Sequence, residues 1–188
     1  LEFDGERASD VLTKAVNDTK DRLMKDAQDS DDNTAIHVSD FAATLIVVVA
    51  NSNGGAFFHV GDGAGTVFSL GNSSGATVSK PENGEYANET YFVTADNWES
   101  HLRVTPFSGE FDTILLMSDG VTPMAMTKGC ALPFDNFVGP VLGFLRGVDE
   151  PTAKKALINT LSDEKVRTVT GDDKTLIWAT KVFSEPSG

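Results

Sequence analysis

The spacing of apolar residues changes twice along this chain. From about Ser9 to Ala27, apolar side chains recur at helical intervals with Lys and Asp between them, which predicts an amphipathic helix. From Phe41 onward, short apolar runs alternate with turn residues, which is typical of strands. The predicted strands are residues 41–50, 56–60, 66–70, 91–94, 102–105, 112–117 and 175–182, with turns at 51–55, 61–63 and 71–75. The turns are too short for crossover helices, so we expect the early strands to form an antiparallel meander.

Helical spacing returns after Gly120. One helix is predicted around residues 137–145, interrupted at Gly139-Pro140, and a second begins at Pro151, a favourable first helical position. A helix, several antiparallel strands, two helices and a last strand together predict an α+β fold. The 188 residues suffice for one domain with a real core, and no repeat or linker is visible. We therefore expect residues 1–188 to form a single domain.

Composition excludes several classes of partner. A formal net charge of −13 would repel nucleic acid, and the longest aliphatic run, residues 45–50, is too short to span a membrane. The acidity has two interpretations: solubility of a cytoplasmic protein, or charge gathered in part at a cation site. The single cysteine, Cys130, favours a reducing compartment such as the cytoplasm and is expected to be a small buried residue. His59 lies between apolar neighbours on a predicted strand, so we expect a structural histidine.

Three aspartates lie at glycine-containing turns beside apolar strands. Asp62 and Asp119 each follow a predicted strand, and Asp172 precedes the last one. A carboxylate there points to the rim of a sheet, where glycine permits close approach of an ion. Several such groups meeting at one rim would suit hard cations such as Mg²⁺ or Mn²⁺. The simpler alternatives are a capping role for Asp119 and hairpin turns for the other two.

These turns belong to a set of motifs that occur in a fixed order. The motifs are Ala43-Thr44-Leu45, residues 59–63 (His-Val-Gly-Asp-Gly), residues 118–121 (Ser-Asp-Gly-Val) and residues 172–176 (Asp-Asp-Lys-Thr-Leu). With them the chain resembles the PP2C family of metal-dependent protein phosphatases, and residues 82–90 are similar to a bacterial subgroup. The resemblance implies an antiparallel β-sandwich flanked by helices, with a metal cluster at one end. It also implies a Mg²⁺- or Mn²⁺-dependent serine/threonine phosphatase whose partners are a phosphorylated protein substrate and a kinase.

The resemblance also implies roles for individual residues. Asp119 and Asp172 match two ligands of one catalytic ion, and Asp62 matches a position that helps to hold a looser third ion with Asp119. Asp173 stands where the family often has Asn, so a role behind the ligands is implied. Two divalent ions can activate a water and neutralise phosphoryl charge, so no catalytic side chain is required. Residues 86–90 lie where relatives carry a flap near the substrate, although polar loop packing explains them equally well.

The family's early metal-binding motifs do not match this chain. Phe3-Asp4-Gly5 is superficially similar to one of them, but Glu6-Arg7 follows where glycines are expected. We therefore expect a fragment that lacks the family's N-terminal strands, binds one ion and hydrolyses phosphate esters slowly or not at all. The alternative function is a non-catalytic PP2C-like binding or regulatory module.

Overall fold

The computed structural model describes residues 3–28, 37–82 and 90–181 of the chain. The chain separates into two compact units. The first comprises Leu1–Asp62 and Pro81–Ser108, and the second comprises Gly63–Lys80 and Gly109–Gly188. Each unit holds one antiparallel sheet. The single domain expected from the sequence stays a prediction.

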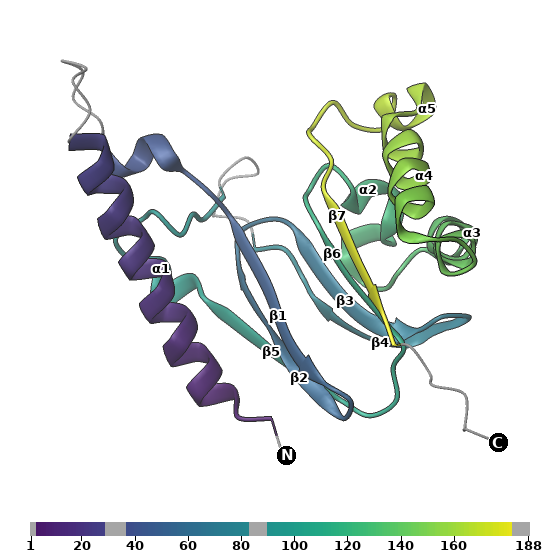
Figure 1. The fold of residues 1–188 in the computed structure, drawn as a ribbon, viewed down its shortest axis with the longest axis horizontal. Helices are drawn as coiled ribbons and strands as arrows, with labels where there is room; N and C mark the ends of the chain where they lie inside the picture. The colour runs from purple at the N-terminus through teal and green to yellow at the C-terminus, as the bar shows by residue number, and fades with distance from the viewer. Residues whose placement is uncertain (1–2, 29–36, 83–89, 182–188) are drawn as a thin grey trace. The chain divides into compact units, whose positions relative to one another are not determined.

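The first unit is a helix beside a three-stranded sheet (Figure 1). Its elements are α1 (Gly5–Gln28), the 3-10 helix η1 (Val38–Phe41), β1 (Leu45–Asn51), β2 (Gly54–Val60), the 3-10 helix η2 (Trp98–His101) and β5 (Arg103–Ser108). The sheet order is β1-β2-β5, and every residue of the central strand β2 is buried. Trp98 is also buried, and its indole Nε1 donates to Asn17 Oδ1 of α1 at 3.1 Å.

The boundaries in the first unit differ from the sequence prediction in three places. Helix α1 begins earlier, at Gly5, because Asp4 caps it: Asp4 Oδ1 accepts from Arg7 N at 3.0 Å. The first strand begins at Leu45 rather than Phe41, since Phe41 ends η1, and β1 is half-buried to exposed rather than buried. The strand predicted at residues 91–94 is absent from this described segment.

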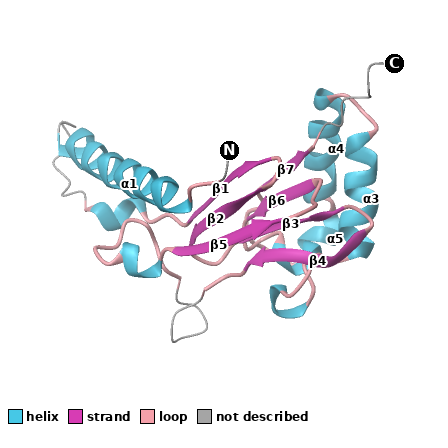
Figure 2. Cartoon of the chain, turned by 90° about the horizontal axis from the view of Figure 1, so that it is seen from below, coloured by secondary structure: helices cyan, strands magenta, loops and turns pink. Residues whose placement is uncertain are grey.

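The second unit is a four-stranded sheet with helices packed against it (Figure 2). Its elements are β3 (Ala64–Ser69), β4 (Asn72–Ser79), β6 (Thr113–Met117), α2 (Thr122–Ala125), the 3-10 helix η3 (Lys128–Cys130), α3 (Asp135–Arg146), α4 (Glu150–Ser162), α5 (Glu164–Arg167) and β7 (Leu176–Thr180). The sheet order is β4-β3-β6-β7, so β6 is central as predicted. One core cluster joins Leu115 and Met117 of β6 to Leu142 and Leu145 of α3.

Two predictions in this part of the chain are wrong. The turn expected at residues 71–75 is shorter, because β4 already begins at Asn72 and pairs with Ser69. Helix α3 runs through Gly139-Pro140 without interruption. A proline there removes one backbone donor, but the helix is anchored on both sides by buried Val138 and Leu142.

The expected meander is also divided. The strands β1 and β2 form one antiparallel hairpin and β3 and β4 form another, but β2 and β3 belong to different sheets. The change of sheet occurs at Gly61-Asp62-Gly63. Gly61 has φ +115°, and a Cβ there would lie 2.4 Å from Thr44 Cγ2, so this turn requires glycine.

An ion pair joins the helices of the second unit to its sheet. Arg146 at the end of α3 donates from Nη2 to Asp112 Oδ1 at 2.8 Å and to Thr113 Oγ1 at 2.7 Å. Burial acts to raise the pKa of Asp112, but hydrogen bonds from Arg146, Thr113 and Leu70 N outweigh it, and the pKa lies below its ordinary value. Helix α3 is thereby fixed where β6 begins.

Among the described residues, every pair of neighbouring strands is antiparallel and the helices lie in separate stretches of the chain, which confirms the predicted α+β class. Cys130 is buried, and burial raises the pKa of its thiol, as expected of a small structural cysteine. Among the helices of the described segments, none is both long enough and apolar enough to cross a membrane.

Candidate metal centre

Pairing between β6 and β7 brings two of the predicted aspartate turns together. The last residue of β6, Met117, pairs with the first residue of β7, Leu176. In an antiparallel pair, the chain leaving one strand lies beside the chain entering the other. Residues 118–120 therefore lie against residues 172–175, and the turns of Asp119 and Asp172 are neighbours in the second unit.

Ser118 fastens these two turns together. Its hydroxyl Oγ donates to Asp173 O at 3.1 Å and accepts from Thr175 N at 3.0 Å. Its backbone N also donates to Thr175 O at 3.0 Å. Ser118 thus fastens the backbone directly before Asp119 to the backbone directly after Asp172. Asp119 itself is exposed, and its Oδ1 accepts from Gly120 N at 2.7 Å.

Gly120 lets the two turns approach more closely than any other residue would. A Cβ at this position would lie 2.3 Å from Asp173 O and 3.0 Å from Asp173 C. Both atoms belong to the backbone, so a side chain could be accommodated only by moving one of the turns. The glycine of the Asp-Gly motif therefore has a packing function.

Replacement of Gly120 by alanine is expected to lower the free energy of unfolding by about 1–3 kcal/mol, the usual cost of overpacking a close contact. It should also weaken Mn²⁺ binding, because the turns of both aspartates must shift. Urea denaturation and calorimetric titration measure the two effects. Gly75→Ala is the matched control, since a Cβ there meets nothing within 4 Å. Equal stability of Gly120→Ala and Gly75→Ala would contradict the packing argument.

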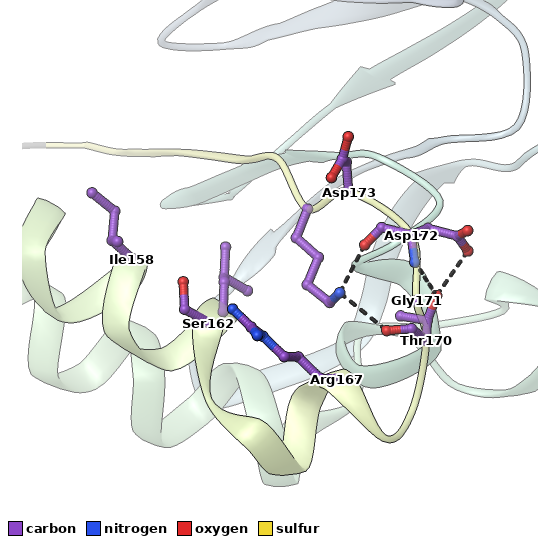
Figure 3. A pocket seen from close by; sticks show the side chains of 9 residues that line it. Ile158, Ser162, Arg167, Thr170, Gly171, Asp172 and Asp173 are labelled. Atoms are coloured by element: carbon purple, nitrogen blue, oxygen red, sulfur yellow. Dashed lines mark hydrogen bonds between the residues drawn. The ribbon is translucent and has the colours of Figure 1, made fainter.

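The turn of Asp172 is organised by the residues on either side of it (Figure 3). Thr170 Oγ1 donates to Asp172 Oδ2 at 2.7 Å and accepts from Asp172 N at 3.1 Å. Lys174 Nζ donates to Asp172 O at 2.7 Å and to Thr170 O at 3.1 Å. The pocket beside this turn is lined on its other side by Ile158, Leu161 and Ser162 of α4 and by Arg167 of α5.

Asp62 lies in the first unit, after β2. Its half-buried carboxylate Oδ2 accepts from Thr90 Oγ1 at 2.6 Å. This bond fixes the orientation of the Asp62 side chain. The role of Asp62 in a third ion site stays a prediction. Asp4, the other carboxylate considered from the sequence, caps α1. Of the predicted flap at residues 86–90, only Thr90 lies within the described residues.

The two aspartates of the second unit are chemically suitable ligands for a divalent cation, but they supply only part of its coordination shell. Asp119 and Asp172 offer exposed carboxylate oxygens on turns that are held together, which suits Mg²⁺ or Mn²⁺. In the part of the chain that the structure describes, no group of three or more His, Cys, Asp or Glu is placed to hold a metal. The two aspartates would thus hold one ion, with other oxygen ligands completing its octahedral shell.

Comparison with known families identifies the family of this chain. The family described as protein phosphatase 2C matches residues 2–162. The chain belongs to the protein phosphatase 2C family. The match includes Asp62 and Asp119 and ends before Asp172. Asp172 lies beside the matched turn of Asp119 because β7 pairs with β6.

Individual protein phosphatase 2C relatives extend the comparison. Serine/threonine-protein phosphatase 3 of Escherichia coli (strain K12) is 30% identical over 181 residues, covering 91% of this chain and 68% of that protein. Among solved structures, a bacterial serine phosphatase has a TM-score of 0.56 at 17% identity, covering 97% of this chain and 73% of its own. Stp1 from Staphylococcus aureus has a TM-score of 0.56 at 16% identity, covering 97% and 71%. These structural likenesses confirm the predicted PP2C-like fold.

Membership of the protein phosphatase 2C family confirms the function predicted from the sequence. The chain is a metal-dependent serine/threonine protein phosphatase domain of a bacterial type, and its substrates are phosphorylated proteins. The alternative of a non-catalytic module is not favoured, because the Escherichia coli relative is named as a serine/threonine-protein phosphatase.

Sequence reasoning missed the residues that hold the two aspartate turns. The sequence pattern places Ser118 only within the Ser-Asp-Gly-Val motif, and it predicts no role for Thr170 or Lys174. The sequence does contain a local signal for Thr170 and Lys174. A hydroxyl two residues before an aspartate can bond to its backbone and side chain, and a lysine two residues after it can reach nearby carbonyls. The role of Ser118 depends on the pairing of β6 with β7.

Proposed function

We propose that Asp119 and Asp172 hold one Mg²⁺ or Mn²⁺ ion of the phosphatase centre. The observation that carries this proposal is the bonding of Ser118 to both Asp173 and Thr175, which keeps the two aspartate turns adjacent. Asp173 acts behind the ligands through its carbonyl oxygen, which accepts from Ser118 Oγ. For Asp62 we propose a weaker ligand role, since its carboxylate is already held by Thr90.

The reaction is hydrolysis of a phosphate monoester on a serine or threonine side chain. When bound, divalent cations would offset charge on the phosphoryl oxygens and make a water more acidic. The task of Asp119 and Asp172 is to present carboxylate oxygens in a fixed arrangement. The task of Ser118 and Gly120 is to keep the two turns at a constant separation, because metal centres depend on the groups that orient their ligands. A nucleophilic side chain is not needed, which agrees with the burial of the single thiol, Cys130.

A further partner follows from the substrate, and a location follows from the state of the single cysteine. A phosphorylated protein substrate requires a kinase that produced it, so we propose that a kinase shares these substrates. We propose the cytoplasm as the location, because the only cysteine is buried and its thiol is free.

The proposed function is tested by phosphate release from a phosphoserine peptide in the presence of Mn²⁺, Mg²⁺ or EDTA. Release is expected to depend on the added cation and to stop with EDTA, and rapid quenching should trap no phosphorylated enzyme. Calorimetric titration with Mn²⁺ measures the ion site even where turnover is slow. Asp172→Asn should lose most of the binding. Turnover that continues undiminished in EDTA, or Mn²⁺ binding that survives Asp172→Asn unchanged, would overturn the proposal.

A further inference from the structure

Two side chains close residues 170–174 into a compact loop. Thr170 Oγ1 both accepts from Asp172 N and donates to Asp172 Oδ2. Lys174 Nζ donates to the carbonyl oxygens of Thr170 and Asp172. All four bonds are 3.1 Å or shorter. They connect the residues on both sides of Asp172 to its backbone and to its carboxylate.

Each side chain has a separate task in this loop. The hydroxyl of Thr170 fixes the orientation of the Asp172 carboxylate, because it bonds to one of its two oxygens. The ammonium of Lys174 fixes the backbone that carries this hydroxyl, because it bonds to the carbonyl oxygens of both Thr170 and Asp172. Lys174 is half-buried, and its Nζ reaches back to the carbonyl oxygens of Thr170 and Asp172. It therefore differs from a lysine whose ammonium extends into solvent.

We propose that Thr170 and Lys174 are positioning residues for Asp172, which orient its carboxylate before a cation binds. This inference depends on the proposed role of Asp172 as a metal ligand. Groups that orient a ligand typically change metal affinity by about 10–100-fold when they are removed. The loop thus confers cation affinity through residues that do not contact the cation.

The positive charge of Lys174 gives the proposal a test based on the sign of a change in Mn²⁺ affinity. A lysine that affected the site only through its charge would repel a divalent cation, and its removal would strengthen binding. A lysine that positions Asp172 has the opposite effect, because without it the carboxylate is no longer held in one orientation. The sign of the change in Mn²⁺ affinity therefore separates positioning from repulsion.

The test is calorimetric titration of the whole chain with Mn²⁺ for a set of matched variants. Lys174→Met and Thr170→Val are each expected to raise the Mn²⁺ dissociation constant by about 10-fold or more. Thr170→Ser keeps the hydroxyl and should stay within about threefold of the wild type, which a merely structural role of the methyl group would not produce. Lys165→Met changes the net charge equally at an exposed site on α5 and serves as the control.

The outcomes distinguish the inference from the proposed function. If Asp172→Asn abolishes binding and Lys174→Met and Thr170→Val weaken it, the positioning role is supported. If Asp172→Asn abolishes binding but Lys174→Met binds Mn²⁺ as tightly as the wild type or more tightly, the positioning role is overturned and the ligand assignment stands. If Asp172→Asn leaves binding unchanged, the ligand assignment itself is wrong. Thermal unfolding without metal identifies folded variants, and a lowered Tm with an unchanged dissociation constant also overturns the inference.

Discussion

Asparagine in place of Asp119 is expected to weaken Mn²⁺ binding by about 100-fold or more, with a matching loss of phosphatase turnover. The substitution keeps the shape of the side chain and an oxygen that can accept from Gly120 N, so the turn should persist. It removes the negative charge that a divalent cation requires of its ligands. Groups that merely orient ligands change affinity by up to about 100-fold, and a direct ligand should reach at least that limit. Calorimetry and phosphate release measure the two losses.

The control for this prediction is Asp135→Asn, which makes the same chemical change at an exposed position in the first turn of α3. It should leave Mn²⁺ binding within about twofold of the wild type. If Asp119→Asn and Asp135→Asn bound Mn²⁺ equally well, Asp119 would be a capping residue of its turn and the metal assignment would fail.

Lowering the pH from 6.5 to 4 is expected to remove roughly 3 kcal/mol of folding stability through His59 alone. His59 is buried on β2, and burial, together with the nearby charge of Arg103, lowers its pKa to about 3. An unfolded histidine has a pKa near 6.5, so between these values the unfolded chain binds a proton that the folded chain does not. Stability contributed by the neutral imidazole is therefore present above pH 6.5. It falls by about 1.4 kcal/mol per pH unit as the pH decreases toward 3.

The measurement is a series of urea denaturations between pH 7 and pH 4 for the wild type, His59→Gln and His37→Gln. Glutamine at position 59 carries no titrating proton, so this variant should show a shallower pH dependence over the interval. His37 is exposed, and its replacement should leave the slope unchanged. Identical slopes for His59→Gln and the wild type would show that His59 does not supply the pH dependence.

The sequence predicted the elements whose causes are local. Residues 114–117 are continuously apolar because β6 is central in its sheet, and helix α4 has an aspartate cap, Asp149, and a proline, Pro151, in its first turn. Errors arose where tertiary packing decides. Pro140 does not interrupt α3, because buried neighbours hold the helix on both sides. The separation of β2 from β3 could not be read from the short turn between them, since a hairpin and a change of sheet use the same turn residues.

In the candidate site, too, local features could be predicted from the sequence and tertiary contacts could not. Aspartates beside apolar strands and glycines were visible in the sequence, because strand ends and turns have local signatures. The sequence did not show that two of these aspartates are neighbours. Asp119 and Asp172 are separated by more than fifty residues, and their turns meet only through the pairing of β6 with β7. The bonds of Ser118 have the same origin: a serine hydroxyl joins two turns only after both strands are in register.

Both turns that Ser118 connects belong to a single compact unit, built on the β4-β3-β6-β7 sheet. Any free energy released when a cation binds Asp119 and Asp172 is therefore coupled to the folding equilibrium of that unit. By thermodynamic linkage, a ligand that recognises only the native form shifts the equilibrium toward it in proportion to the logarithm of its concentration. Cellular supply of the ion would then determine how much of this unit stays folded as well as how fast it turns over substrate.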